Sequence, residues 1–392
     1  MVKRIIFDSI QRMWSKGKSI LLLGPRQTGK TTLINKFDVD LNISFLSTRI
    51  RIDYERNPDL ILKEVAALKL KRPARIIIDE VQKVPDIMDP IQKLIDDKKA
   101  QFFITGSSAR KLKMQTDINL LPGRVIYYRL DAFSIEEYKV NDIIDLLYYG
   151  SLPEIVLTDD IELKDELLRS YVEIYLEEEI RKEAQIRNIP DFYEFLELAA
   201  QRAGEITSYS GIAQDVGLSH VTVKSYYEIL ESTLIADKIN PIIESKKRKK
   251  LIRSPRYLFF DLGVRRYSAN EGLHLPKSLE GKVFEQFIGQ EIIRYIRSNK
   301  LKSSLSFWQD PEVADVDWVI VSSKKYYPIE VKYTDKIKTS DLKHLRNFIQ
   351  EYDCPKGGMV IYTGRNRILL EENIIAIPWS QLPEYLDEIK IR

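Results

Sequence analysis

The sequence is poor in the features that mark secreted and membrane-spanning proteins. Its 392 residues include a single cysteine, Cys354, which excludes an intrachain disulfide framework and a cysteine-based zinc site. No apolar run approaches the ~20 residues that span a bilayer. The first residues, MVKRIIFDSIQRMW, mix charge with apolar side chains and lack the apolar core of a signal peptide. We therefore expect a cytoplasmic protein with no membrane partner.

A strong charge imbalance is also missing, as are repeats and low-complexity tracts. The net charge of +3 is too small to identify a nucleic-acid partner, so only local clusters of charge can indicate one. Hydrophobic residues make up 44% of the chain and charged residues 30%, which is typical of folded globular proteins. A chain of this length is expected to form two or three domains.

The most specific pattern in the chain is a phosphate-binding loop. Residues Gly24 to Thr31 read G-x-x-x-x-G-K-T, the motif whose backbone N–H groups surround the phosphates of a nucleoside triphosphate. The apolar run Ser19–Leu23 before it is typical of a buried parallel strand, and the residues after it can continue as a helix. Lys30 would reach the β- and γ-phosphates, and the Thr31 hydroxyl would bind Mg²⁺. The predicted ATP-binding residues are Gly24, Pro25, Arg26, Gln27, Thr28, Gly29, Lys30, Thr31 and Thr32.

Apolar runs alternate with helical patterns through the first third of the chain. The runs after the loop are Asn42–Ser47, Arg75–Asp79, Gln101–Thr105 and Val125–Tyr128. This alternation predicts an α/β fold, a parallel sheet covered by helices.

An acid pair, Asp79-Glu80, ends the second of these runs. Ligands of open α/β sheets bind at the carboxyl ends of the strands, where this pair would emerge. Asp79 would bind Mg²⁺ directly or through water, and Glu80 would polarise the attacking water. The alternative, two solvated acids at a strand end, loses weight because the phosphate loop precedes them.

Two further segments contain candidate catalytic residues. Thr105 and Ser107 follow the next strand and could contact the γ-phosphate or the water, although a helix N-cap at Ser107 or Ser108 is compatible with the same pattern. Arg124 lies in a turn, and an arginine can stabilise the charge on a transferring phosphoryl group, often from a neighbouring subunit. An ordinary surface arginine is an equal alternative.

These elements resemble a prokaryotic family of AAA+-type P-loop ATPases that carry a C-terminal nuclease-like domain. The resemblance rests on GPRQTGKTTL, RIIIDEVQKVPDI, FFITGSSARKL, LPGRVIYYRLDAFSIEEY and YGSLPEIVL. It implies an additional-strand P-loop core, a homo-oligomer, and a role for Arg124 as a candidate arginine finger. We expect an ATPase domain over residues 1–130, a helical lid and winged-helix domain over 131–240, and a wing with a restriction-endonuclease-like α/β domain over 241–392.

The middle region carries a helix-turn-helix pattern. Helices are predicted over Asp191–Ala203 and Tyr209–Val216, the second ended by Gly217, and Ser219 would cap a third helix to about Glu231. The strands of a wing are predicted over Leu234–Ile239 and Tyr257–Phe260, with the basic run Lys246–Lys250 between them, followed by Arg253 and Arg256. This pattern predicts DNA binding, and the residues expected to face the groove are His220, Thr222, Lys224 and Ser225. A packing module with a solvated lysine loop is the alternative.

The C-terminal region holds a second constellation of charged residues. Asp317 lies in the strand-like run DVDWVI, and Glu330 and Lys332 lie two positions apart in YPIEVK, so they would share one face of a strand. Asp317 and Glu330 would hold a catalytic metal, and Lys332 would orient or deprotonate the attacking water. The pattern resembles the PD-(D/E)xK nuclease motif through GKVFE, VDW and PIEVK, which makes Glu285 the helical acid, although Val316 replaces the proline before the motif acid. An ordinary solvated Glu-x-Lys pair is the alternative.

The leading hypothesis is an Mg²⁺-dependent ATPase that acts on DNA, with ATP and Mg²⁺ as its ligands. The first alternative is an ATP-gated, metal-dependent DNA nuclease. The second is a nucleotide-switched signalling or scaffold protein whose nuclease-like domain is degenerate.

Overall fold

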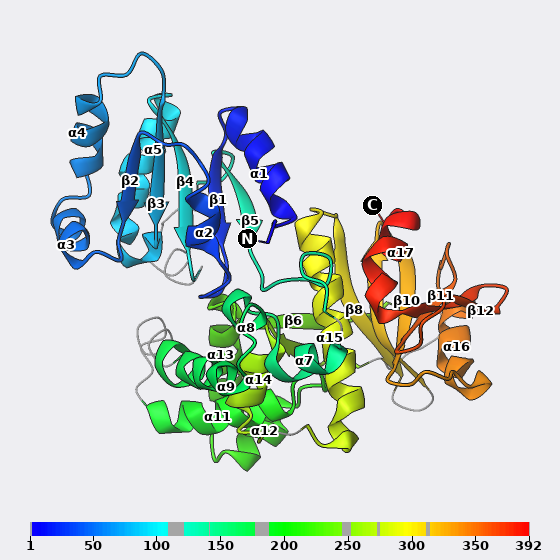
Figure 1. Ribbon diagram of the computed structural model, residues 1–392. Coiled ribbons are helices and arrows are strands. Elements are labelled where there is room, and N and C mark those ends of the chain that lie inside the picture. The colour runs from blue at the N-terminus through cyan, green and yellow to red at the C-terminus, as the bar shows by residue number, and fades with distance from the viewer. Residues whose placement is uncertain are drawn as a thin grey trace.

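The computed structural model describes residues 2–108, 121–140, 142–176, 188–244, 252–272, 275–310 and 314–391. Figure 1 shows an N-terminal α/β unit in blue and cyan, a group of helices in green, and a second sheet with its helices mostly in yellow to red. No described helix combines the length and hydrophobicity needed to cross a lipid bilayer.

The N-terminal unit is built on a parallel sheet of five described strands in the order β2-β3-β4-β1-β5. The strands are β1 (Ser19–Leu23), β2 (Leu41–Ser44), β3 (Ala74–Asp79), β4 (Ala100–Gly106) and β5 (Val125–Arg129). Every strand predicted for this region is present, and the prediction of a parallel sheet is confirmed. In this order, β4 lies between β1, which precedes the phosphate loop, and β3, which ends in Asp79.

Helices cover both faces of this sheet. Alternate residues of each strand point to opposite faces, and apolar residues on both faces pack against helices. The described helices are α1 (Ile6–Ser15), α2 (Lys30–Ile34), α3 (Thr48–Arg56), α4 (Leu60–Ala67) and α5 (Met88–Asp96). Ile20 packs with Trp14 of α1 on one face, and Leu21 belongs to a separate core with Ile91 of α5 on the other. The strand therefore has to be apolar at every position, as Ser19–Leu23 nearly is.

The middle region is helical and has its own core. Its described helices are α7 (Ile143–Tyr149), α8 (Pro153–Val156), α9 (Ile161–Ser170), the π-helical turn Tyr171–Leu176, α11 (Ile189–Gln201), α12 (Tyr209–Asp215), α13 (His220–Ser232) and α14 (Leu262–Ser268). The three helices predicted between residues 191 and 231 are present as α11, α12 and α13, and their ends differ from the prediction by one or two residues. Gly217 has a φ of 67°, as expected for the turn that ends α12.

The C-terminal sheet has eight described strands in the order β12-β13-β11-β10-β9-β8-β6-β7. The strands are β6 (Ala236–Pro241), β7 (Arg256–Phe259), β8 (Ser303–Asp310), β9 (Ala314–Ser322), β10 (Lys325–Lys332), β11 (Gly358–Tyr362), β12 (Ile368–Glu371) and β13 (Ile374–Pro378). The helices around it are α15 (Lys277–Ser298), α16 (Lys343–Glu351) and α17 (Leu382–Glu388).

The two strands expected to form a wing are part of this larger sheet. β6 and β7 pair antiparallel as expected, but β6 also pairs with β8 through Asn240 and Pro241. A freestanding wing is therefore not what these strands form, and the boundary expected after residue 240 falls inside β6. The pattern of the hairpin alone could not reveal its third neighbour, because β8 lies more than sixty residues further along the chain.

Candidate functional site

The phosphate loop runs from the end of β1 to the start of α2 and needs both of its glycines. A Cβ on Gly24 would come 2.2 Å from the carbonyl oxygen of Leu130, and Gly29 has a φ of 90°, a region that side chains disfavour. The Thr28 hydroxyl donates to the Pro25 carbonyl at 2.9 Å and so tightens the turn. The loop is thus shaped by its own backbone contacts.

Lys30 is the charged group of the loop, and it is 95% buried. Its ammonium Nζ donates to the carbonyl oxygens of Gly24 and Pro25, each at 2.8 Å. Carbonyl oxygens carry only partial negative charge, so an anionic phosphate is the stronger partner for this buried cation. Thr31 and Thr32 next to it are exposed to solvent.

Asp79 lies at the end of β3, opposite the phosphate loop, and is buried. Its Oδ2 is 3.4 Å from the Thr31 hydroxyl, and its Oδ1 accepts a short hydrogen bond from Thr105 at the end of β4. Burial raises the pKa of the Asp79 carboxyl above its usual value, and the Thr105 and Thr31 hydroxyls and the Lys30 ammonium partly oppose that effect. A bound divalent cation would favour the ionised carboxylate.

Glu80 follows Asp79 and has a left-handed backbone, with φ 60° and ψ 47°. Its Oε2 accepts from Gln82 Nε2 at 2.5 Å and from the Ser107 hydroxyl at 3.3 Å. Gln82 also donates to Ser107 Oγ at 2.7 Å, so the three side chains form a closed triangle. The structure therefore brings Glu80 and Ser107 together, as well as Asp79 and Thr105.

Sequence reasoning missed Gln82 and Arg4. Gln82 is 97% buried and lies in the short 3₁₀ turn Val81–Lys83. Its position two residues after Glu80 is the sequence feature that could have indicated its role. Arg4 donates from its two terminal nitrogens to the carbonyls of Thr28 and Asp131, both at 2.7 Å. No local motif identifies Arg4, because its partners lie far away in the chain.

Arg124 lies at the opposite end of the sheet from the phosphate loop. It precedes Val125, which pairs with Ser19 at the start of β1, whereas the loop follows the end of β1. Its guanidinium forms two hydrogen bonds with Asp96, at 2.7 and 2.9 Å. The structure thus does not bring Arg124 to the loop of its own chain.

The C-terminal constellation is brought together by α15, β9 and β10. The Asp317 carboxylate accepts from the Val331 backbone N–H at 2.7 Å, next to Glu330. Lys332 Nζ donates to Glu330 Oε1 at 2.6 Å, while the buried Glu330 Oε2 has no hydrogen-bond partner among the described residues. Burial and the nearby Asp317 carboxylate raise the pKa of Glu330 to about 9 and the pKa of Glu285 to about 8.

Arg256, which follows the basic run in the sequence and was expected on or near the wing, lies within this constellation instead. It is 94% buried, donates to Glu285 Oε1 at 2.7 Å, and stacks its guanidinium over the Phe307 ring, 4.4 Å from the ring centroid.

Among the described residues, no group of three or more His, Cys, Asp or Glu side chains is arranged to hold a metal ion. Glu285 is paired with an arginine here, so Asp317 and Glu330 remain as the two candidate metal ligands.

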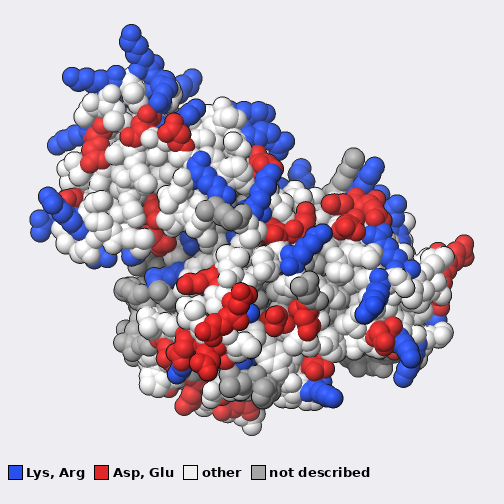
Figure 2. Space-filling view, in the orientation of Figure 1, with Lys and Arg blue, Asp and Glu red and all other residues white. Residues whose placement is uncertain are grey.

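The helix predicted to read DNA, α13, begins with an exposed N-terminal turn. His220, Lys224 and Ser225 are exposed, whereas the Thr222 hydroxyl is 2.8 Å from the hydroxyl of the capping Ser219. The rest of the middle region is acidic on the face seen in Figure 2. The basic run Lys246–Lys250 lies outside the described residues.

Comparisons with known proteins identify one of the three regions. Residues 16–139 match the model of an AAA domain, residues 140–273 match a domain of unknown function (DUF8612), and residues 280–382 match another domain of unknown function (DUF4143). The AAA match supports a P-loop ATPase-like family and a nucleotide-binding N-terminal region, and the parallel sheet is consistent with it. The other two matches assign no activity.

Relatives match along most of the chain but are themselves uncharacterized. A protein of Mycobacterium tuberculosis is 22% identical over 380 residues, which cover 95% of this chain and 82% of that protein. A protein of Methanocaldococcus jannaschii is 24% identical over 386 residues, which cover 89% of this chain and 86% of that protein. A solved structure from Vibrio cholerae aligns over 95% of this chain and 97% of its own, at 12% identity and a TM-score of 0.22, a value that supports no conclusion about fold or function.

Proposed function

We propose that this protein is an Mg²⁺-dependent AAA+-type ATPase that couples ATP hydrolysis to action on DNA. The observation that carries the proposal is the meeting of two motifs at one edge of the sheet. The Thr31 hydroxyl of the phosphate loop lies 3.4 Å from the Asp79 carboxylate, although 48 positions separate them in the chain. Phosphate, metal and water ligands would thus converge where ligands of open α/β sheets bind.

Each residue has a distinct role in this proposal. Lys30 and the loop backbone would bind the phosphates, and the Thr31 hydroxyl and Asp79 carboxylate would hold Mg²⁺, since oxygen ligands suit this cation. The bound cation would neutralise phosphate charge. Glu80 would orient the attacking water and accept its proton, held in place by Gln82 and Ser107.

The first experiment measures ATP binding and turnover of two variants. Lys30→Ala removes the buried cation, so we expect loss of nucleotide binding. Glu80→Gln keeps the loop and should bind ATP while turnover falls by about 10² to 10⁴-fold, the range for a lost general base. Lys16→Ala, an exposed lysine beyond α1, is the matched control. Unchanged ATP affinity in Lys30→Ala would overturn the assignment.

The action on DNA is supported by the exposed N-terminal turn of α13 and its cap at Ser219. The test is ATP turnover with and without duplex DNA, in the wild type and in Lys224→Ala. We expect DNA to change turnover in a salt-sensitive manner and the variant to weaken that response. ATP turnover that ignores DNA would instead favour a nucleotide-switched scaffold.

A second candidate function, metal-dependent DNA cleavage, is favoured by one observation. Within the part of the chain that the structure describes, the buried Glu330 Oε2 near the Asp317 carboxylate has no hydrogen-bond partner, and a buried unpaired oxygen is often completed by an ion. Two carboxylates are a sufficient protein contribution for Mg²⁺, which keeps several waters. Nicking of plasmid DNA with Mg²⁺ or Mn²⁺ should disappear in Lys332→Ala while ATP turnover survives. Absence of nicking in the wild type would remove this candidate.

A homo-oligomer is also part of the proposal. Arg124 lies too far from the loop of its own chain to contact a nucleotide there, so an arginine-finger role would require a neighbouring subunit. The ion pair between Arg124 and Asp96 would then have to break when the subunits assemble.

A further inference from the structure

A basic groove lies at the edge of the N-terminal sheet, at the opposite end from the phosphate loop. It has a volume of about 460 Å³ and is formed by the ends of α4 and α5 and the segments that lead into β3 and β4. One acid, Asp97, lines it together with six cationic residues. These are Lys69, Lys71, Arg72, Lys93, Lys98 and Lys99.

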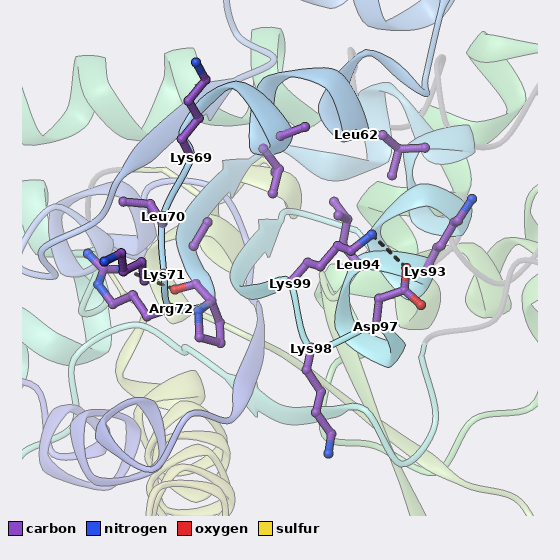
Figure 3. A pocket seen from close by; sticks show the side chains of 14 residues that line it. Leu62, Lys69, Leu70, Lys71, Arg72, Lys93, Leu94, Asp97, Lys98 and Lys99 are labelled. Atoms are coloured by element: carbon purple, nitrogen blue, oxygen red, sulfur yellow. Dashed lines mark hydrogen bonds and ion pairs between the residues drawn. The ribbon is translucent and has the colours of Figure 1, made fainter.

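Most of this positive charge is not neutralised by neighbouring acids. Lys99 lies 3.4 Å from Asp97, and Arg72 forms an ion pair with Asp40 at 2.7 Å. In the described part of the chain, the other four lysines of the groove take part in no ion pair and are exposed. Figure 3 shows the ends of Lys69, Lys93 and Lys98 extending away from the ribbon into open space.

The positive surface continues beyond this groove. A second hollow of about 490 Å³ shares Arg72, Pro73 and Lys98 with it and adds Lys18 and Arg75. Figure 2 shows the corresponding edge of the N-terminal unit crowded with Lys and Arg side chains. Two adjoining hollows with shared cations form an extended track, which suits a linear polyanion better than a small ligand.

The side chains of the track indicate which polyanion it fits. Among the described residues that line the two hollows, none is aromatic, so no platform for stacking unpaired bases exists there. Lysine ammonium groups act as point charges that bind phosphates without reading sequence. We propose that this track binds the phosphate backbone of duplex nucleic acid without sequence preference.

The track is separate from α13 and from the candidate ATP site of its own chain, and Arg124, the proposed arginine finger, lines its second hollow. β3 runs from Ala74 at the groove to Asp79 at the candidate catalytic edge, and five residue steps give a length of about 17 Å. A duplex on the track would therefore leave the phosphate loop open to ATP. The competing occupant is the acidic middle region of a second copy, whose charge would also complement the lysines.

The test compares two variants that lose the same charge. The track variant replaces Lys69, Lys71, Lys93 and Lys98 with Ala, and the control replaces the exposed lysines Lys302, Lys324, Lys325 and Lys356 with Ala. Affinity for a mixed-sequence duplex is measured by fluorescence anisotropy between 50 and 200 mM salt, conditions in which phosphate contacts dominate. The track variant should lose about tenfold or more in affinity, and its slope of log K against log salt should become shallower by about 3.6, or 0.9 for each lost phosphate contact.

Three outcomes would overturn the proposal. Equal losses in both variants would show only a general charge effect, and an unchanged track variant would exclude the surface. Loss of self-association in sedimentation, with duplex binding intact, would assign the track to a second copy of the chain. ATP turnover without DNA is measured in the same preparations, and we expect both variants to keep it, so failure of the track and failure of the ATPase assignment are distinguishable.

Discussion

Gln82 holds two side chains of the candidate ATP site at once. It donates to Glu80 Oε2 at 2.5 Å and to Ser107 Oγ at 2.7 Å, and it is buried on the floor of the site. Its other amide atom, Oε1, lies close to Gly106, where a Cβ would come within 2.8 Å of it. The glutamine therefore fixes the direction of the carboxylate that would accept the proton of water.

Gln82→Ala is expected to release Glu80 without touching the phosphate loop. Because a misplaced base mainly slows the chemical step, turnover should fall by about 10- to 100-fold while the KM for ATP changes little. Steady-state kinetics measure turnover and the KM for ATP separately, and Gln214→Ala at an exposed position is the control. A large rise in KM at unchanged turnover would contradict a positioning role and indicate damage to nucleotide binding.

The helix α15 is the element that carries candidate residues at one end and interdomain contacts at the other. Glu285 lies in its first half. In its second half, Glu291 and Arg294 contact Ile135 and Phe133 of the segment that follows the N-terminal sheet. Gly289 lies between these two groups. A Cβ on Gly289 would come 2.8 Å from Leu258 and 2.9 Å from Trp318, so the helix approaches the sheet closely only because this residue is glycine.

Two glycines of α15 should respond to alanine with opposite signs. Alanine in a helix is favoured over glycine by about 1 kcal/mol, and at the exposed Gly281, where nothing lies within 4 Å of a new Cβ, this gain should appear. At Gly289 the buried Trp318 ring cannot move away, and overpacking costs about 1–3 kcal/mol, which outweighs the gain. Thermal unfolding of both variants checks the prediction. Equal shifts would show that the close approach carries no strain.

The sequence allowed good predictions where the pattern is local. The strands of the N-terminal sheet, the ends of α12 and α13, and the cap at Ser219 all follow from neighbouring residues. Contacts between distant segments could not be predicted, as the pairing of β6 with β8 and the burial of Arg256 against Glu285 illustrate. Arg256 follows a basic run, and only the folded chain places it beside an acid from another element.

The same limit applies to the candidate site. Motif spacing predicted Lys30, Asp79 and Glu80 as site residues, because the motifs describe how a strand end presents them. The distances among Thr105, Ser107 and Gln82 depend on β4 lying next to β3, which a local pattern cannot specify. The proposed roles of Lys30, Glu80 and Gln82 are predictions that the variants above test.

At the scale of the whole molecule, a network of four charges joins the N-terminal sheet to the C-terminal sheet. Arg129 at the end of β5 pairs with Asp131 at 3.0 Å and with Asp237 of β6 at 2.9 Å. Arg297 of α15 pairs with the same two acids, at 3.1 and 2.5 Å. These side chains are mostly buried, so the pairs are screened little by salt.

Asp237→Asn is expected to weaken this junction in a pH-dependent way. Burial disfavours the charge of Asp237, but Arg129 and Arg297 outweigh it and lower its pKa to about 2. A carboxyl with a lowered pKa stabilises the fold above its unfolded pKa of about 4, and that stability, about 2 kcal/mol here, is lost as pH falls from about 4 to 2. At pH 7 the variant should unfold at lower temperature, since two buried guanidinium groups then share only Asp131.

Thermal unfolding between pH 2 and 7 measures this contribution of Asp237. Between pH 4 and 2 the wild type should lose more stability than Asp237→Asn, because the variant has no carboxylate to protonate at that position. The exposed Asp159→Asn is the matched control and should follow the wild type. An Asp237→Asn curve parallel to the wild type at every pH would mean that the ion pairs of Asp237 do not stabilise the fold. A selective loss would instead show that Asp237 stabilises the fold through its pairs with Arg129 of the N-terminal sheet and Arg297 of α15.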